Sequence, residues 1–340
     1  MLLLRGKPVD NRCRVSRVSH AGVVTELMLP GADADEPVDL SQPFTLAAAR
    51  KMGLSKRELY SDSYVRLFQG VYVSRRTTRT LALRARGALV VAPKPSVVSH
   101  QTAATLWGGH AAQSPMIHLS MPVKVNCIRE GIQVHRLLRP PSPTTWLGLP
   151  VTSPERTFCD LAGSLRLVEL VALGDRLVRR ERTTPERLRV AAMNWPGYHQ
   201  QLIGRAAGLV RAGVDSRPES HLRMLMVLAG MPEPQTAVPL VNAVTGKVER
   251  YLDTGWSELR LAIEYDGSQH REDEEIYESD ILRHEEVREQ RDWRIVRVTK
   301  AMYDAPYPTL LRIHNARVER GASPVLLREE WQRYFTGRIR

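Results

Sequence analysis

The sequence predicts a multi-domain α+β protein, within the broad α/β class, and three observations support this. First, 340 residues are enough for two or three domains. Second, hydrophobic residues make up 43% and charged residues 25% of the chain, which is typical of a globular protein and excludes a largely disordered one. Third, helical and strand-like patterns alternate from residue 44 onward.

The charge of the chain is strongly positive and unevenly distributed. Lys and Arg number 49 against 37 Asp and Glu, which gives a formal net charge of +12. Residues 41–100 hold eleven basic and two acidic side chains, whereas residues 271–290 hold nine carboxylates and three arginines. An excess of positive charge in one segment favours a polyanionic partner, so we expect double-stranded DNA to bind the N-terminal half.

Other general features restrict the class of protein. Cys13, Cys127 and Cys159 are too few and too scattered for a disulfide framework, and no CxxC pair offers a zinc site. The three leucines at the start are too short for a signal-peptide core, and no run of 18 apolar residues follows. We therefore expect a cytoplasmic protein with no membrane partner. Residues 1–40 are expected to form a flexible extension, to which we assign no function.

Residues 41–78 have the pattern of a winged helix-turn-helix. FTLAAARKMG fits a helix that ends at Gly53, Ser55 can cap a second helix, and VRLFQGVYV alternates around a Gln69-Gly70 turn. The second helix of such a fold enters the major groove, and the hairpin contacts the backbone. The alternative is a small helical domain with a solvated basic face. The candidate DNA-binding side chains are Lys51, Lys56, Arg57, Arg66, Arg75 and Arg76.

Residues 79–210 predict a middle mixed α/β domain. Ser99 is expected to cap a helix over HQTAATLW, and IHLSMP and GIQVHRLL are expected to be strands. Ser153, followed by Pro154, predicts a capped helix on which Arg156 and Asp160 form a salt bridge. The histidines of this region lack metal-ligand spacing, so no chemistry is expected here.

Residues 211–325 contain a set of carboxylates that could form one site, and residues 326–340 form a basic tail. Glu219 opens a predicted helix, Asp253 ends the strand VERYLD, and Glu264 and Asp266 share one face of the strand LAIEYD. Carboxylates that converge repel one another until a cation such as Mg²⁺ or Mn²⁺ neutralises them. An oxygen-ligand site of this kind suits metal-assisted hydrolysis of phosphodiesters.

Each of these residues also has a purely structural interpretation. Glu219 can close a capping box with Ser216, and Asp266-Gly267 is a common turn pair. His270 alone is more typical of a surface residue, and the run REDEEIYESD is typical of a solvated helix face. Only the ordered set favours a functional site.

That ordered set resembles a known family. Glu219 on a helix, Asp253, IEYDGSQH, a helix with Asp280 and Arg283, and WRIVRV are together similar to the very-short-patch-repair endonuclease-like domain of unknown function. This group belongs to the restriction-endonuclease-like, PD-(D/E)xK superfamily, and the resemblance covers about a third of the chain. It implies a mixed central sheet flanked by helices and Mg²⁺- or Mn²⁺-dependent DNA hydrolysis. The catalytic positions that it implies are Glu219, Asp253, Glu264, Asp266, His270 and Arg283.

The resemblance also implies a division of roles. Asp253 and Glu264 would be metal ligands, with Glu219 in support. His270 would transfer a proton or orient the phosphate, and Arg283 would contact the phosphate or the transition state. One position departs from the superfamily, because its usual lysine, two residues after the glutamate, is Asp266 here. The departure leaves the general base unassigned and keeps a degenerate, binding-only domain as an alternative.

The first half of the chain resembles a second family. The strings FTLAAARKMGLSKRELY, RLFQGVYV, SHQTAATLWGG and VTSPERTFCDLA are similar to AbiEi-type antitoxins of type IV toxin–antitoxin systems. The resemblance implies a winged helix that binds promoter DNA, followed by a mixed α/β domain. We therefore weigh a metal-dependent DNA endonuclease or nickase against a non-catalytic, antitoxin-like transcriptional regulator, with a protein-interaction module as the third reading. No toxin partner is identified, and homodimer formation is left open.

Overall fold

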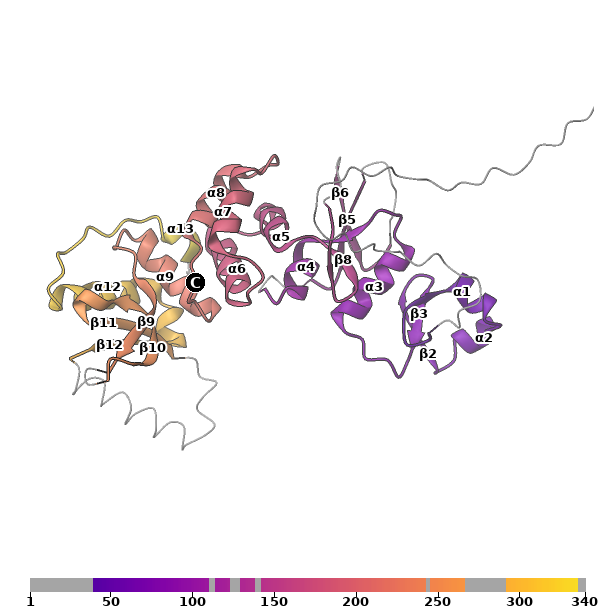
Figure 1. Ribbon diagram of the computed structural model, residues 1–340, viewed down its shortest axis with the longest axis horizontal. Coiled ribbons are helices and arrows are strands. Elements are labelled where there is room, and N and C mark those ends of the chain that lie inside the picture. The colour runs from indigo at the N-terminus through magenta and orange to yellow at the C-terminus, as the bar shows by residue number, and fades with distance from the viewer. Residues whose placement is uncertain are drawn as a thin grey trace, which may run out of the picture. The chain divides into compact units, whose positions relative to one another are not determined.

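The structure of the chain, a computed structural model, describes residues 39–109, 114–122, 129–137, 142–242, 245–266 and 292–335 (Figure 1). The chain divides into two units, residues 1–38 and 39–340, and every described residue belongs to the second. Helices and three sheets make up the described part, which confirms the mixed α+β class. The expected flexible extension lies outside the described residues except for its last two positions.

The first sheet and its two helices are formed by residues 44–74. Thr45 caps the first helix by accepting a hydrogen bond from the Ala48 N–H. Ser55 and Glu58 cap the second helix reciprocally, and Gly70 takes a φ of +77° in the hairpin turn. The two helices, the turn and the hairpin predicted here are confirmed. The elements are β1 (Phe44–Thr45), α1 (Leu46–Lys51), α2 (Lys56–Leu59), β2 (Tyr64–Phe68) and β3 (Val71–Ser74), with the antiparallel order β1-β3-β2.

A five-stranded mixed sheet follows. Its strands at residues 117–122 and 132–137 are those expected from IHLSMP and GIQVHRLL. Ser99 precedes a helix as predicted but makes no side-chain cap; its hydroxyl instead accepts a hydrogen bond from the Ser120 hydroxyl at 2.8 Å. The elements are α3 (Leu81–Val91), β4 (Val97–Val98), α4 (His100–Leu106), β5 (Ile117–Pro122), β6 (Ile132–Leu137), β7 (Thr144–Trp146) and β8 (Leu149–Val151), with the strand order β6-β5-β4-β8-β7.

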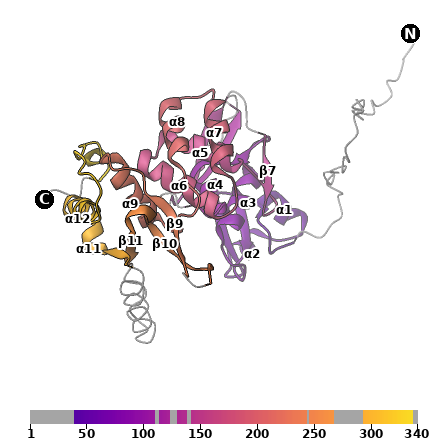
Figure 2. The same cartoon turned by 60° about the vertical axis from the view of Figure 1, so that its left-hand side comes forward.

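A run of helices connects this sheet to the last one. Ser153 caps the first of them with Pro154 in its first turn, and Arg156 pairs with Asp160 at 2.8 Å, both as predicted. Helices α7 and α8 lie side by side in both views (Figures 1 and 2). The elements are α5 (Pro154–Asp160), η1 (Leu161–Gly163), α6 (Leu167–Arg179), α7 (Pro185–Met193) and α8 (Gln200–Leu209).

The third sheet has the order β12-β11-β10-β9, in which β11 and β12 are parallel and the other pairs antiparallel. Helices α9 and α12 both contact this sheet (Figure 2). Leu261 and Ile263 are fully buried in the core, as the strand alternation predicts. The elements are α9 (Arg217–Leu228), β9 (Gln235–Val241), β10 (Val248–Trp256), η2 (Ser257–Leu259), β11 (Leu261–Asp266), β12 (Arg294–Thr299), α11 (Lys300–Tyr303), α12 (Pro306–Glu319) and α13 (Gln332–Phe335).

The second and third sheets share one hydrophobic cluster, which extends from Phe68 in β2 to Trp331. The predicted boundaries at residues 78 and 210 therefore divide a continuous core, and as domain limits they stay predictions. The expected acidic helix lies outside the described residues. None of the described helices combines the length and the apolar character needed to span a bilayer.

Candidate active site

Asp253 lies at an irregular point of the third sheet. The pairing of β9 with β10 passes over Asp253 and Ala237, and Ala237 has a φ of +49°, in the left-handed region. The Asp253 carboxylate accepts a hydrogen bond from the Tyr265 N–H at 2.9 Å. Beyond it, a Cβ atom on Gly255 would lie 2.2 Å from the Leu261 carbonyl oxygen, so only glycine permits this approach of β10 to β11. The irregularity thus fixes the carboxylate against the backbone of the next strand.

Glu264 lies on that next strand, close to Asp253. The pairing of Thr254 with Ile263 brings this part of β11 beside β10. The Glu264 side chain is 14% exposed and forms an ion pair with Arg250 of β10. In the parallel register, Arg297 of β12 is its neighbour on the other side. Two arginines therefore lie on strands that flank Glu264.

Glu219 lies in the first turn of α9. Ser216 caps the helix by accepting from the Glu219 N–H at 3.3 Å, and the Glu219 carboxylate accepts from the Asp215 N–H at 2.9 Å. The Ser216 cap is therefore confirmed, while the Glu219 carboxylate bonds the N–H one residue before Ser216. Capping does not exclude a second role, because a carboxylate has lone pairs left for another partner.

The three carboxylates are coupled electrostatically. Burial, followed by the charge of Glu219, raises the pKa of Asp253 to about 7, and the charge of Glu264 adds to this rise. The Tyr265 N–H and the Arg250 guanidinium act in the opposite direction. Burial also raises the pKa of Glu219. Residues distant in sequence, on α9, β10 and β11, thus lie close enough to disfavour one another's charge.

The remaining predicted site residues are less closely placed. Asp266 is the half-buried last residue of β11, beside Thr299 of β12 in the register. His270 and Arg283 lie outside the described residues. Within the described ranges, no three acidic, histidine or cysteine side chains are gathered as ligands for one metal ion. The donors present are carboxylate oxygens, which suit Mg²⁺ or Mn²⁺, but Arg250 occupies an oxygen of Glu264.

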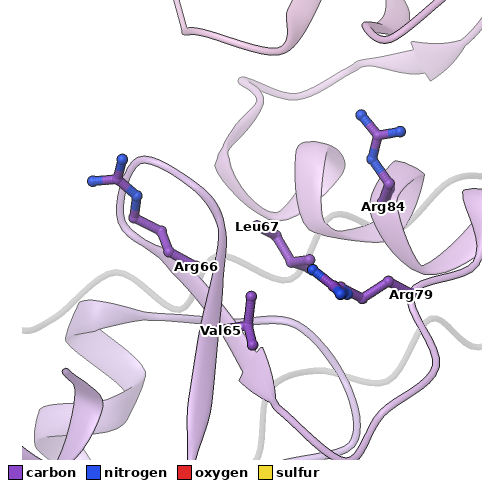
Figure 3. Close-up of a pocket in the computed structure, with 5 residues that line it drawn as sticks. All are labelled: Val65, Arg66, Leu67, Arg79 and Arg84. Carbon is purple, nitrogen blue, oxygen red and sulfur yellow. The ribbon is translucent and has the colours of Figure 1, made fainter. Parts of the chain in front are cut away.

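The predicted DNA-binding side chains are all exposed, on α1, α2, β2 and the turn that follows β3. Arg75 differs from the others because its guanidinium pairs with Asp62 at 3.1 Å. Arg66 lines a surface hollow together with Arg79 and Arg84 (Figure 3). In the sequence, Arg79 and Arg84 contribute only to the count of positive charge. Their spacing in the sequence does not predict that they lie near Arg66, because Arg84 lies on a different element from Arg66.

The structure also brings together three histidines that the sequence left scattered. The rings of His100 and His135 stack with centroids 3.4 Å apart, and His118 Nδ1 is 2.9 Å from His135 Nε2. Burial lowers the pKa of His100 to about 3 and that of His135 to about 4, so the stack is neutral at ordinary pH. The ring nitrogens bond one another and the Ser99 and Ser114 hydroxyls, which agrees with a packing role.

Comparisons with known proteins identify no family for this chain. No protein-family model matches the sequence, and no curated protein matches it significantly. Among solved structures, the crystal structure of the RV2827C protein from Mycobacterium tuberculosis is similar over 49% of this chain and 74% of that chain. The two share 17% sequence identity with a TM-score of 0.35, a likeness too small to establish a common fold.

Proposed function

We propose that this protein is a Mg²⁺- or Mn²⁺-dependent DNA endonuclease or nickase that its basic N-terminal segment brings to double-stranded DNA. One observation carries the proposal: Glu219 and Glu264, from two other elements, both raise the pKa of Asp253. Although Arg250 pairs with Glu264, the carboxylates still disfavour the charge of Asp253, and clustered half-buried carboxylates destabilise the folded state while no metal ion is bound. A bound divalent cation would neutralise the repulsion between these carboxylates and so account for the cluster.

In this proposal, Asp253 and Glu264 hold the ion and Glu219 supports it. A bound divalent ion would polarise the scissile phosphate and ease the loss of a proton from water. The protein's own groups prepare the site for it. The Tyr265 N–H orients the Asp253 carboxylate, and Arg250 pairs with Glu264.

Arg250 also offers the positive charge that the resemblance leads one to expect from a lysine. Asp266 replaces that lysine and cannot offset negative charge at the site. The Arg250 guanidinium lies within ion-pair distance of Glu264 and lowers the pKa of Asp253, so its charge reaches both carboxylates. Since arginine stays protonated, Arg250 would contact phosphate and not act as the general base.

The test is cleavage of supercoiled plasmid by the full chain in Mg²⁺ or Mn²⁺. We expect the parent protein to nick or linearise the plasmid and Glu264→Gln to lose at least about 100-fold of the rate, as removal of a charged active-site group typically does. The matched control is Glu186→Gln on α7, whose carboxylate is 71% exposed and pairs with Arg189. That control should cut like the parent.

Binding of the metal gives a second readout. Mn²⁺ should raise the melting temperature of the parent protein, because a ligand that binds only the folded state stabilises it. The same addition should have little effect on Glu264→Gln. Equal cleavage and an equal Mn²⁺ response in both proteins would show that these carboxylates are not the site.

A second candidate function is a non-catalytic, antitoxin-like DNA-binding regulator with a degenerate nuclease domain. The ion pair between Arg250 and Glu264, together with Asp266 in the lysine position, favours it. This candidate predicts salt-dependent duplex binding with no cleavage in either metal, and unchanged binding by Glu264→Gln. Cleavage that depends on Glu264 would exclude it.

A further inference from the structure

A strongly cationic hollow lies beside the β2–β3 hairpin. It encloses about 520 Å³ and is lined by Val65, Arg66, Leu67, Arg79 and Arg84. None of its lining residues is acidic. Arg66 belongs to β2, Arg79 directly precedes the cap of α3, and Arg84 lies in the first turns of α3 (Figure 3). Two elements therefore bring three guanidinium groups to one surface.

The charge of these arginines is not neutralised locally. Glu58 and Asp62 are the two acidic residues of the segment 41–100, and both are engaged elsewhere. The Glu58 carboxylate accepts from the Ser55 N–H at 2.7 Å, and Asp62 pairs with Arg75. In the described part of the chain, neither Arg66 nor Arg79 has an ion-pair partner. The hollow consequently presents uncompensated positive charge to solvent.

The three guanidinium groups do not converge on one point. Arg79 extends toward Leu67, whereas Arg66 and Arg84 extend away on either side (Figure 3). Arg84 is held in its direction because its Nη2 donates a hydrogen bond to the Pro115 carbonyl oxygen. A single small anion would need converging donors, but a chain of phosphates needs donors spaced along its path. The arrangement therefore fits an extended polyanion.

We propose that this hollow, with Arg66, Arg79 and Arg84, binds the phosphate backbone of duplex DNA at the base of the hairpin. The assignment rests on the DNA-binding part of the proposed function and adds two residues, Arg79 and Arg84, to the expected contact surface. An acidic protein is a poorer fit, because protein interfaces centre on apolar and aromatic groups. Val65 and Leu67 are the only apolar residues among those that line the hollow. Contacts of this kind add affinity without base preference.

The test measures the affinity of the full chain for two unrelated labelled duplexes, in EDTA so that no cleavage occurs, over about 50 to 200 mM salt. Each phosphate contact contributes about 0.9 to the slope of log affinity against log salt concentration. We expect Arg79→Ala to reduce the slope by about 1, and the double variant Arg66→Ala/Arg79→Ala to reduce it by about 2. The loss of affinity should be about tenfold for the double variant and equal for both duplexes.

The matched control is Arg189→Ala on α7, an arginine that is 43% exposed and pairs with Glu186. It removes the same charge from a different surface, so the slope should stay that of the parent. Arg79→Lys keeps the charge and should keep most of the slope, which separates loss of contact from disturbed folding. A parent-like slope in the double variant would overturn the assignment and leave the nuclease proposal standing.

Two further outcomes are decisive. If the parent protein binds neither duplex at the lowest salt, the DNA-binding part of the proposed function fails, and this inference fails with it. If polyglutamate of equal charge displaces the duplex as well as unlabelled DNA does, the hollow recognises acidic protein and not a phosphate backbone. Displacement by DNA alone supports the assignment.

Discussion

The basic segment of residues 41–100 and the carboxylate cluster on α9, β10 and β11 place their charged side chains in opposite environments, one exposed and the other half-buried. In the basic segment, the six predicted DNA-binding side chains are exposed, and the charges of Arg66 and Arg79 are uncompensated among the described residues. In the carboxylate cluster, burial and like charges raise the pKa of Asp253 to about 7. The charges of the basic segment are hydrated and have little effect on the stability of the folded state. The charges of the carboxylate cluster are partly buried beside like charges, which lowers that stability.

A third charged group shows what the same fold does when a buried charge serves stability. Arg223 is buried on α9 and bonds Asp175 of α6 and Glu233, both at 3.0 Å, as well as the Leu209 carbonyl oxygen. Asp175 also accepts hydrogen bonds from Ser220 and from the Arg211 N–H. Opposite charges thus surround one another there. Asp253 instead has two carboxylates as neighbours besides the Arg250 guanidinium, and this difference supports the proposed metal site.

The largest predicted effect tests that contrast. Arg223→Met would leave Asp175, 1% exposed, without its counter-ion. Breaking one side of a buried ion pair typically costs about 3–5 kcal/mol of unfolding free energy, so we expect a loss of that size. Denaturant unfolding followed by circular dichroism measures it, with the midpoint falling and the slope unchanged.

The control for this prediction lies on the same helix. Arg217→Met removes an arginine that is 51% exposed and pairs with Glu169. An ion pair of this kind contributes about 0–1 kcal/mol, so the variant should stay close to the parent. If both variants lost a similar amount of unfolding free energy, burial of the ion pair would not explain the contribution of Arg223 to stability.

The sequence predicted much of this fold because local rules decide it. The Ser55 cap, the turn at Gly70 and the strand alternation of Leu261 and Ile263 depend on neighbours within a few residues. The convergence of Glu219, Asp253 and Glu264 as a metal site was also expected from the sequence, and the metal site stays a prediction. The pairing of Arg250 with Glu264 was not expected, because it depends on the register of two strands that the sequence does not define.

The hollow at the hairpin was missed for the same reason. Arg66 and Arg84 are 18 positions apart and line the same hollow because α3 packs beside β2. Charge counting identified the basic segment correctly as a feature of composition, but it could not tell Arg75, which is paired, from Arg79, which is not. An ion pair between residues this far apart in the sequence depends on where the fold places the two side chains, and no sequence pattern predicts it.

The second predicted effect concerns Asp253 and its pH dependence. An aspartate in the unfolded chain titrates near 3.8, and Asp253 in the folded protein titrates near 7. Between these values the folded protein keeps a proton that the unfolded chain has released, so metal-free stability falls as pH rises through this window. Asp253→Asn cannot ionise and should be more stable than the parent at pH 8 by about 1–2 kcal/mol, a value reduced for partial solvent exposure.

Thermal unfolding in EDTA at about pH 4 and pH 8 checks this prediction, because the two ends of the window bracket the titration. The asparagine oxygen can still accept the Tyr265 N–H, so the hydrogen bond itself is preserved. The difference between variant and parent should be small at the lower pH and positive at the higher one. The same difference at both pH values would show that Asp253 is not under electrostatic strain.

The smallest predicted effect belongs to Arg75. Its pair with Asp62 is formed by side chains that are 57% and fully exposed, so Arg75→Ala should leave the unfolding midpoint unchanged within error. Its effect on DNA is the sharper measurement. Because Asp62 already offsets its charge, Arg75→Ala should change the salt dependence of duplex binding less than Arg79→Ala does, although each variant removes one arginine. Asp62→Ala releases Arg75 and should strengthen binding slightly. If Arg75 and Arg79 proved equivalent, local pairing would not decide which arginines reach DNA, and net charge alone would describe this surface.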